Sequence, residues 1–575
     1  MRRSKTGAYR PKPEFIQTAL TPWARLLAQE ATIWNDARRT AQTGTKILIG
    51  SSVGGAYGGA PMDTLLAVAL TLRGANVHFL LCDRQLPACS ETYVASESLQ
   101  YKFAQEGPSQ LKCDKCVGHG YANLEALGLP IHLFSALITR ADRVQAEQIA
   151  KSLPLAEIPR YHYQGMSLGE HAFANALRFY VKGDLADEPL GEMILRRYLK
   201  AAYLTGVSVK RFLQTQPFAR AAIYDGIYVP NGIVSEALLA NNIPLVRWVP
   251  GYRTHTFIAA HRAPPHTELM HEPVSLWENL ELTPALQEQL MSYLNHRWSA
   301  QYNWFGPSIQ KESQNDVRQI SEQLGIDFNR PTIGLLTNLT WDAQVFYPSN
   351  AFSSVVDWVL QTLDYFDKRP DLQLVIRVHP MEVRGTLPTR QPILREIYKA
   401  RPRLPKNVFV IPPESTINTY VTMRQCNAAL IYGTRTGIEV ACMGIPVITA
   451  GEAWVRNKGI TNDAHSAAEY FSMLDRLPLP SRMSDAQILR ARKYAYHYYF
   501  RRMIPIPFAE PLYGYPPYKI ETWSLRELMP GQASGLDLIC DGILNGTAFV
   551  YPAEQAIESA PIENNNEPLR AVLKQ

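Results

Sequence analysis

Short apolar runs alternate with longer amphipathic stretches along most of the chain. In the first of these units, Lys46–Ile49 and Asn76–Leu81 are predicted strands, with a helix between them that begins near Met62. A glycine-rich loop, residues 51–59, joins the first strand to this helix, and Arg73-Gly74 is a typical helix end. Strand, loop, helix and strand in this order predict the first unit of a doubly wound parallel sheet.

The same alternation continues and then restarts after a polar, Trp-rich stretch between about 265 and 330. We expect two facing Rossmann-like α/β domains, the GT-B architecture: residues 1–320, residues 321–483, and a C-terminal helical extension with a frayed tail over 484–575. Further predicted strands are 222–228, 244–249, 332–336, 372–378, 408–411, 428–432 and 446–450, and further predicted helices are 232–240 and 351–366.

Composition narrows the class of protein. The chain has 575 residues, of which 46% are hydrophobic and 10% aromatic, and this excludes intrinsic disorder. No apolar run reaches the length of a membrane span, and no apolar core follows the basic N-terminus as in a secretory signal. We therefore expect a cytoplasmic protein.

The net charge of +6 is a small excess for this length, and no basic stripe indicates nucleic-acid binding. The densest basic segment, residues 490–502, is interleaved with aromatic side chains. It predicts either a helix with a solvated basic face or contact with an anionic partner, such as the inner membrane face or a polyanionic glycan.

Four of the seven cysteines, Cys82, Cys89, Cys113 and Cys116, lie close together in the sequence, with His119 just beyond them. Four thiols can hold a tetrahedral structural zinc, although this spacing fits no standard finger. Ordinary buried thiols and a redox pair are the alternatives.

Three loops at predicted strand ends carry candidate ligand-binding residues. In the loop 51–59, Gly54 and Gly55 allow close approach of a substrate, or form a tight strand–helix turn; the loop matches neither the dinucleotide nor the P-loop fingerprint. After the strand 372–378, Arg377 and His379-Pro380 suit a phosphate, since arginine pairs with it bidentately and histidine donates to it.

The third loop runs from Tyr432 into a predicted helix. Its hydroxyl and backbone N–H groups suit a phosphate, and a carboxylate one turn into the helix could accept from ribose hydroxyls. The candidates here are Thr434, Arg435, Thr436, Gly437 and Glu439, and Asn338 is a further candidate for nucleotide binding.

Candidate acid–base groups lie in the N-terminal half: Asp225, Glu236, His255 and His261. Asp225 precedes a glycine within a strand-like run, where a carboxylate without a function is unfavourable, so it ranks first and His255 is kept as a catalytic candidate. No Asp-x-Asp occurs in the chain. We therefore expect no catalytic metal, and leaving-group charge neutralised by protein groups.

These motifs resemble those of bacterial capsule-polysaccharide glycosyltransferases, including Kdo transferases, over about residues 333–463. The matching positions are Thr436, Gly437, Glu439, Gly444, Pro446, Val447, Gly451, Trp454, Gly459 and Thr461, together with the VIRVHP segment. Trp248, Tyr252 and Arg253 resemble an N-terminal segment of capsule-biosynthesis proteins more loosely. Where Kdo transferases often carry Ser-Ser-x-Gly, this chain has Thr434-Arg435-Thr436-Gly437.

The resemblance implies a GT-B glycosyltransferase that moves a sugar from a CMP-, UDP- or GDP-linked donor to a cell-surface polysaccharide or glycolipid. His379 and Arg377 would contact the donor phosphate, Glu439 the ribose, and the N-terminal domain the acceptor. A CDP-polyol phosphotransferase, a sugar-nucleotide epimerase and a non-catalytic glycan- or nucleotide-binding assembly protein are the alternatives.

Overall fold

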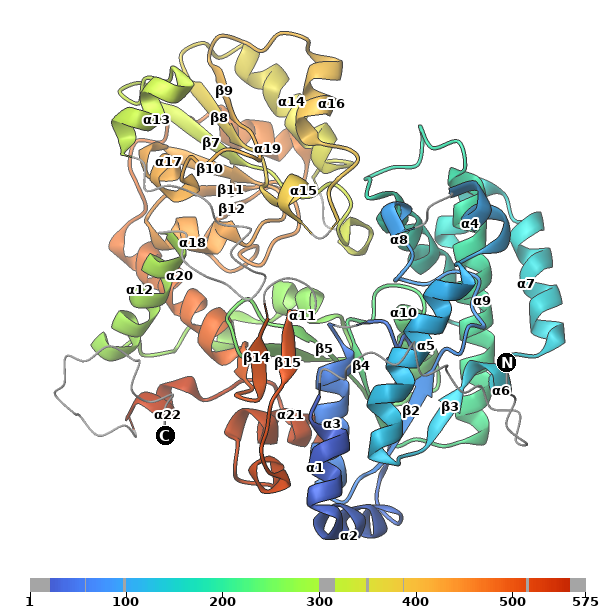
Figure 1. Ribbon diagram of the computed structural model, residues 1–575. Coiled ribbons are helices and arrows are strands. Elements are labelled where there is room, and N and C mark those ends of the chain that lie inside the picture. The colour runs from blue at the N-terminus through green and yellow to red at the C-terminus, as the bar shows by residue number, and fades with distance from the viewer. Residues whose placement is uncertain are drawn as a thin grey trace.

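The computed structural model describes residues 21–56, 58–96, 100–298, 316–347, 351–385, 387–512 and 517–558. Two mainly parallel sheets form two lobes (Figure 1). The predicted α/β class with two facing Rossmann-like domains is confirmed. The C-terminal tail predicted to fray lies outside the described residues, and the exact domain boundaries stay a prediction.

The first sheet has seven strands in the order β13-β6-β5-β4-β1-β2-β3. β6 runs opposite to the other six strands, so its pairings with β5 and β13 are antiparallel. The strands are β1 (Lys46–Ile49), β2 (Asn76–Leu81), β3 (Ile131–Leu133), β4 (Arg220–Tyr224), β5 (Leu245–Pro250), β6 (Thr256–His261) and β13 (Ile504–Pro505).

The second sheet has six parallel strands in the order β12-β11-β10-β7-β8-β9, the arrangement of a Rossmann sheet. Its strands are β7 (Thr332–Leu336), β8 (Gln373–Arg377), β9 (Val408–Ile411), β10 (Ala428–Ile431), β11 (Val447–Thr449) and β12 (Asn462–Asp463).

Both faces of each sheet are covered by helices, which explains why the strands are apolar runs without alternation. On β1, Ile47 and Ile49 join the core cluster that contains α3, whereas Leu48 joins the cluster on the opposite face with α9. On β7, Leu336 and Leu335 divide between two clusters in the same way.

The described part of residues 82–219 contains β3 and six α-helices of the first lobe, although we predicted no element there. The longest, α9, buries one broad face along its length. The helices of this lobe are α1 (Trp23–Gln29), α2 (Ala31–Ala41), α3 (Ala60–Leu72), α4 (Gln100–Glu106), α5 (Gln110–Leu124), α6 (Phe134–Leu137), α7 (Arg140–Ser152), α8 (Leu168–Tyr180), α9 (Gly191–Thr215) and α10 (Asn231–Ala240). The 3-10 helix at 155–160 lies between α7 and α8.

The polar, Trp-rich stretch is helical where the structure describes it, and it links the lobes. Its first helix, residues 265–271, packs on β6. The next two, residues 284–298 and 317–324, pack on helix 419–425 of the second lobe. The helices from here to residue 474 are α11 (Pro265–His271), α12 (Pro284–Trp298), α13 (Val317–Leu324), α14 (Val355–Asp367), α15 (Met381–Arg384), α16 (Ile393–Ala400), α17 (Thr419–Gln425), α18 (Thr436–Cys442) and α19 (Ala467–Leu474).

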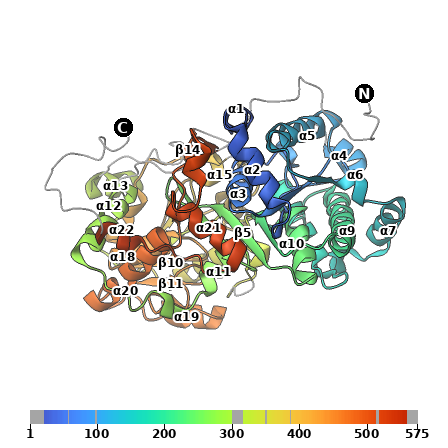
Figure 2. The same cartoon turned by 90° about the horizontal axis from the view of Figure 1, so that it is seen from below.

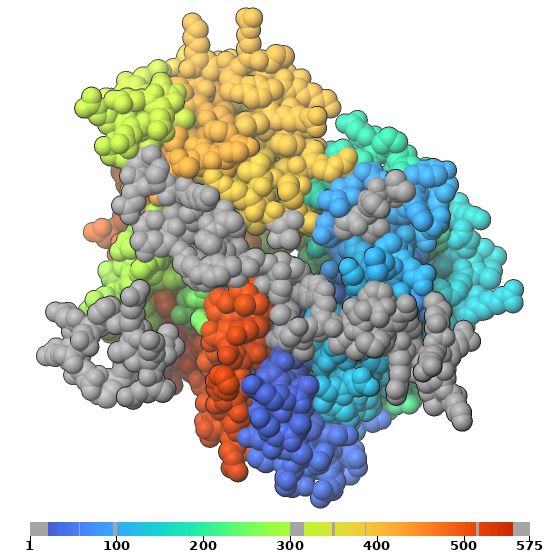
Figure 3. All heavy atoms as spheres, viewed as in Figure 1, coloured from blue at the N-terminus to red at the C-terminus, as the bar shows by residue number. Residues whose placement is uncertain are grey.

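The C-terminal segment packs on both lobes. After α20 (Asp485–Tyr496) beside α18, the chain returns to the first lobe, adds β13 to its sheet and lays α21 (Ser534–Asn545) against β5 (Figure 2). The strand pair β14 (Ala509–Pro511) and β15 (Tyr518–Ile520) lies beside the N-terminal helices (Figure 3). Helix α22 (Ala553–Glu558) follows.

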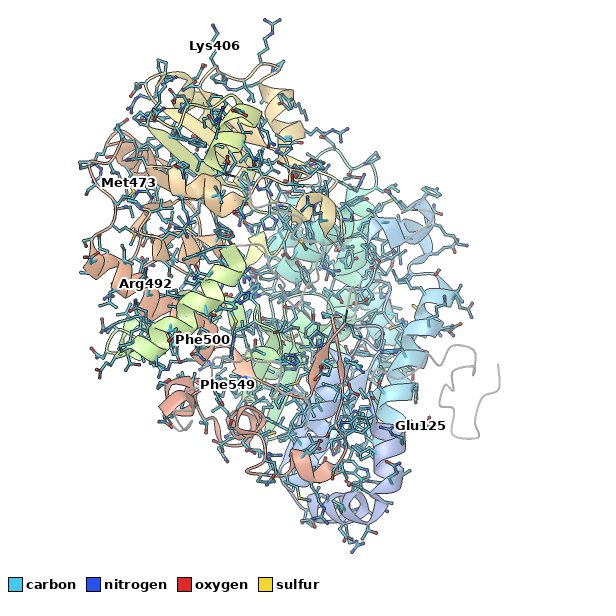
Figure 4. All side chains as sticks on the ribbon, turned by 60° about the vertical axis from the view of Figure 1, so that its left-hand side comes forward. Glu125, Lys406, Met473, Arg492, Phe500 and Phe549 are labelled. Carbon is cyan, nitrogen blue, oxygen red and sulfur yellow. The ribbon has the colours of Figure 1, made fainter. Side chains whose placement is uncertain are left out.

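The basic and aromatic segment 490–502 does not form the predicted solvated face. Its aromatic side chains are buried, and so are His497 and Arg502. His497 Nε2 lies 2.8 Å from Glu272 Oε1, and Arg502 donates to the Phe549 carbonyl at 3.0 Å. Figure 4 labels Phe500 and Phe549 near each other; Phe500 belongs to the core cluster that contains α18 of the second lobe, and Phe549 to the cluster that contains α3 of the first lobe. The segment is therefore mainly a core element, but Arg490, Arg492, Lys493 and Arg501 are only half-buried. Contact with an anionic partner stays a prediction.

Asp63, on helix α3, has a buried carboxyl group. Burial raises the pKa of Asp63 to about 8, although hydrogen bonds with Ser51 and Trp248 work against this. Trp248 Nε1 donates to Asp63 Oδ1 at 3.1 Å. Asp63 is therefore protonated and neutral in the folded protein at neutral pH, which suits a position with 4% exposure.

Asp63→Asn is expected to remove a pH dependence of stability. Because the folded pKa lies above the unfolded value of 3.8, this group stabilises the fold fully below pH 3.8, and that contribution is lost as pH rises toward 8. The difference in unfolding free energy between wild type and variant should fall by about 1.4 kcal/mol per pH unit. Urea unfolding at pH 5, 6 and 7 measures it, and a pH-independent difference would contradict the assignment.

Candidate functional site

Each sheet has a crevice at its carboxyl edge where the strand order reverses, between β1 and β4 and between β7 and β10. Two sets of contacts show that these edges face each other. Asp225, after β4, lies within electrostatic range of Asp342, after β7. Arg435, just before α18, stacks on Tyr252, just after β5. The candidate site therefore lies between the lobes.

A second contact joins the lobes beside this junction. Arg390 N–H donates to the Val181 carbonyl at 3.1 Å, and Gly183 N–H donates to Gln391 Oε1 at 2.8 Å. The Glu188 carboxylate lies 3.0 Å from the Arg390 guanidinium. These contacts hold the loop after α8 against the segment between α15 and α16.

The glycine loop after β1 packs against α5. A Cβ on Gly54 would lie 2.4 Å from the Cys116 carbonyl, and Gly55 N–H donates to Cys116 Sγ at 3.0 Å. Ser51 Oγ accepts from Tyr224 N–H at 2.9 Å, which ties the loop to the end of β4. The glycines thus serve helix packing, and substrate contact by Gly54 and Gly55 stays a prediction.

Asp225 stands at the end of β4 rather than inside a strand, because β4 stops at Tyr224. Its φ of +61° and that of Gly226 at +78° form a left-handed turn that Asp tolerates better than most residues. Burial raises the pKa of Asp225 to about 6, with Arg178 lowering it and Asp342 raising it. The carboxylate is therefore ionised at neutral pH but close to its titration range, as a general base requires.

Arg178 and Asp342 are the charged neighbours that sequence reasoning missed. The Arg178 guanidinium lies 5.1 Å from the Tyr228 ring centroid. Burial raises the pKa of Asp342, and Arg178 lowers it. The loop that carries Asp342 packs on the first lobe through Phe346 and His171, whose ring centroids lie 5.4 Å apart. Neither Arg178 nor Asp342 belongs to a sequence motif, because the two residues come from different lobes and approach each other only where the lobes dock.

The other acid–base candidates of the first lobe are not gathered around Asp225. Glu236 Oε2 accepts from Ser167 N–H at 3.1 Å, and its Oε1 lies 3.8 Å from His171. His255 occupies the β5–β6 turn on the side of the site, with φ +55°. His261 ends β6, and because β6 is antiparallel this places it at the opposite edge of the sheet, beside Val246. The suggestion that His261 belongs to the site is wrong.

His379 follows β8 at the carboxyl edge of the second sheet, as predicted. Its N–H donates to Thr337 Oγ1 at 2.9 Å, and its Nδ1 accepts from Met381 N–H at 3.2 Å. Because Nδ1 is an acceptor, the proton of the neutral ring lies on Nε2. Burial, together with the charges of Arg377 and Arg435, lowers the pKa of His379 to about 4. His379 is thus a neutral Nε2–H donor.

Arg377 points away from the crevice. Its Nε donates to Thr419 Oγ1 at 3.1 Å and its Nη1 to the Pro412 carbonyl at 2.8 Å. The side chain is buried with 2% exposure. Arg377 therefore anchors the loop between β9 and α17, and the predicted phosphate contact would require it to leave these partners.

The loop between β10 and α18 is held by hydrogen bonds to second-lobe groups. Asn338 Oδ1 accepts from Gly433 N–H at 3.2 Å across the crevice between β7 and β10. Thr434 Oγ1 accepts from Thr436 N–H at 3.3 Å. A Cβ on Gly437 would lie 2.6 Å from Ile431 Cδ1, so this glycine lets α18 pack on its strand. Their contacts with a nucleotide stay predictions.

Glu439 is completely buried in α18 and fully engaged by protein groups. Arg297 Nε of α12 donates to Oε1 at 2.6 Å, Tyr499 donates to Oε1 at 2.7 Å, and Tyr420 donates to Oε2. Burial alone would raise the pKa of Glu439, but Arg297, Arg435 and the two tyrosines lower it overall. Glu439 anchors α12 here through Arg297, and its contact with a ribose stays a prediction.

Arg435 lies where the lobes meet. Its guanidinium carbon stands 4.0 Å from the Tyr252 ring centroid, and its Nη1 is buried with no hydrogen-bond partner among the described residues. Burial and the charge of Arg435 lower the pKa of His266, in α11, to about 4. The Tyr252 ring is in turn 6.4 Å from the Trp454 ring. Arg435 is the candidate residue that bridges both lobes.

The four cysteines converge beside the glycine loop without forming a metal site. Burial raises the pKa of all four thiols, and each of Cys89, Cys113 and Cys116 lies within electrostatic range of Cys82. No group of three or more His, Cys, Asp or Glu residues in the described part of the chain is arranged to hold a metal ion. His119 instead lies 3.1 Å from Asn123. The predicted zinc site therefore has no preformed ligand set among the described residues.

Residues 267–500 match the family model "Capsule polysaccharide biosynthesis protein". The resemblance to capsule polysaccharide biosynthesis proteins is confirmed. The family segment contains His379, Arg435 and Glu439, and it also includes the predicted motif range 333–463. It begins in α11 and ends in the buried aromatic segment after α20. No curated protein sequence matches the chain.

Solved structures with a similar chain course include two transferase modules and a synthase. The Thermosulfurimonas dismutans KpsC beta Kdo 2,4 transferase is 15% identical, with a TM-score of 0.32, over 48% of this chain and 80% of that one. The beta Kdo 2,7 transferase of the same organism is 13% identical, with a TM-score of 0.28, over 50% and 79%. The alpha,alpha-trehalose 6-phosphate synthase of Burkholderia multivorans is 11% identical, with a TM-score of 0.30, over 79% and 93%. At these values the likenesses say nothing about the reaction.

None of the helices in the described ranges is long and apolar enough to cross a membrane.

Proposed function

We propose that this protein is a metal-independent glycosyltransferase that moves a sugar from a nucleotide-activated donor to a capsule-type polysaccharide or glycolipid. The observation that carries the proposal is the pairing of two unlike crevices. The second lobe presents neutral and cationic donors, His379 and Arg435, at its carboxyl edge. The first lobe presents the ionised carboxylate of Asp225 opposite them. The match to the capsule family supports the same class of reaction.

In this scheme the second lobe stabilises the leaving nucleotide. As the bond to the sugar breaks, negative charge grows on the phosphate oxygens, and the Nε2–H of His379 and the guanidinium of Arg435 are already oriented to receive it. His379 needs no proton from solvent to act as a donor, because its neutral ring already carries the proton on Nε2.

The first lobe would activate the acceptor. Asp225 either removes the proton of the acceptor hydroxyl or stabilises an oxocarbenium-like centre on the sugar. Arg178, beside both Asp225 and Asp342, offsets the charge of the two carboxylates while the lobes are closed. We propose that the acceptor is presented at the inner face of the membrane, with the half-buried basic side chains of residues 490–502 as the contact.

Nucleotide binding tests the proposal without knowledge of the sugar. In a thermal-shift panel of CMP, CDP, UDP and GDP, a nucleotide at about 100 times its Kd stabilises the protein by about 2.7 kcal/mol. His379→Ala is expected to weaken that binding about 10- to 100-fold, since it removes a hydrogen bond to a charged group. His296→Ala, at an exposed position on α12, is the matched control. If no nucleotide shifts the protein, a glycan-binding assembly protein becomes the better interpretation.

A further inference from the structure

Arg435 lies beside the buried ion pair of Arg297 and Glu439, whose Nε and Oε1 atoms are 2.6 Å apart. Burial and the charge of Arg297 lower the pKa of Arg435, but Glu439, Tyr498 and Tyr499 raise it overall, so the side chain is held as a cation. Glu439 already has Arg297 as its partner, and Asp342, across Tyr252 from Arg435, lies beside Arg178. A bound anion would therefore meet in Arg435 a cation that is not the first partner of either carboxylate.

The Arg435 side chain is held in place for such an anion. Its plane lies on the Tyr252 ring at 4.0 Å, which fixes the guanidinium and leaves its edge N–H groups for polar contacts. Nη1 is shielded from solvent and donates to no atom in the described ranges. Arg377, by contrast, donates to the Thr419 hydroxyl group and to the Pro412 carbonyl group.

The position of Arg435 separates it from the first phosphate site. His379 follows β8 and contacts only second-lobe groups, Thr337 and Met381. Arg435 follows β10 and stands on a first-lobe ring, so it lies on the acceptor side of the junction. The two remain close enough for the charge of Arg435 to lower the pKa of His379. His379, followed by Arg435 on the side of the acceptor lobe, gives two successive hydrogen-bond donors. This arrangement matches the two successive phosphates of a diphosphate.

We propose that Arg435 binds the second phosphate of a nucleoside diphosphate donor, while His379 binds the first. This inference rests on the proposed glycosyltransferase function and names its donor class. The diphosphate would place its outer phosphate against Arg435 and hold the attached sugar next to Asp225.

Matched nucleotide pairs test this directly. Calorimetric titration with CMP and CDP, UMP and UDP, and GMP and GDP gives the ratio of monophosphate to diphosphate Kd for each base. For the preferred base we expect the diphosphate to bind about 10- to 100-fold more tightly in wild type. Arg435→Met should bring this ratio close to one while leaving monophosphate affinity unchanged, and Arg435→Lys should keep part of it. Arg490→Met, which removes an equivalent arginine stacked on Trp277 at 5.1 Å, should leave the ratio unchanged.

The unliganded protein provides a second readout. Because Arg435 Nη1 donates to no atom in the described ranges, Arg435→Met should melt close to wild type without ligand, and clearly lower than wild type only with the diphosphate present. Equal affinity for mono- and diphosphates in wild type would overturn the inference. So would a variant that weakens both nucleotides equally, or neither. Absence of all nucleotide binding would instead overturn the proposed function itself.

Discussion

Asp225→Asn is expected to slow sugar transfer by about 10²–10⁴-fold, with nucleotide affinity unchanged. Asparagine keeps the size of the side chain and tolerates the left-handed backbone at φ +61°. It removes the carboxylate that the reaction uses as a base or as a stabilising charge. Release of free nucleotide from the donor that binds best measures the rate, and calorimetry measures affinity.

The pH profile distinguishes this role from a structural one. With a pKa of about 6 for Asp225, the rate should rise with pH through that value and level off as the carboxylate ionises. Asp342→Asn removes a negative charge that raises this pKa, so it should move the acidic limb to lower pH. Asp114→Asn, at a carboxylate paired with Arg84 at 2.8 Å, should leave the limb in place. An Asp225→Asn enzyme of wild-type rate would contradict the assignment.

Arg297→Met is expected to destabilise the second lobe by about 3–5 kcal/mol, because it leaves the fully buried Glu439 carboxylate without its cation. For a unit of this size that corresponds to a fall in melting temperature of roughly 6–20 °C. Thermal denaturation followed by circular dichroism measures the change.

Two variants control for the loss of the side chain itself. Arg318→Met breaks an exposed helical pair with Glu322 and should cost less than about 0.5 kcal/mol. The double variant Arg297→Met, Glu439→Leu removes both buried charges and should recover much of the loss. If the double variant is as unstable as the single one, packing rather than charge explains the effect.

The sequence predicted the fold well where one strand leads directly into the next helix. The bounds of β1, β2, β7 and β9 match the predicted ranges, because short apolar runs between glycines and polar residues define buried parallel strands. The long helix α9 was missed, since its buried face includes Tyr, Ser and Thr as well as aliphatic residues. The antiparallel β6 was missed because parallel and antiparallel neighbours share the same apolar pattern.

The candidate site was predictable only in part. Strand ends placed His379 and Asp225 at the facing edges, because their positions depend on local order along the chain. The partners of these residues depend on distant contacts. Arg377 points to Pro412 and Thr419, and Glu439 is occupied by Arg297 from a helix in a stretch without a motif. Asp342 enters the site only through the docking of the lobes, and Arg178 and Tyr252 gain their second-lobe neighbours, Asp342 and Arg435, in the same way.

The return of the C-terminal segment to the first sheet affects how the chain must fold during synthesis. Strand β6 ends at His261 and its edge partner β13 begins at Ile504, so about 240 residues separate them. At ribosomal rates of roughly 5–20 residues per second, the apolar edge of β6 stays unpaired for about 12–50 s. An open strand edge is a template for pairing with other chains. Newly made N-terminal lobes are thus exposed to aggregation until the last tenth of the chain has emerged, and expression yield should depend on chaperones that cover this edge.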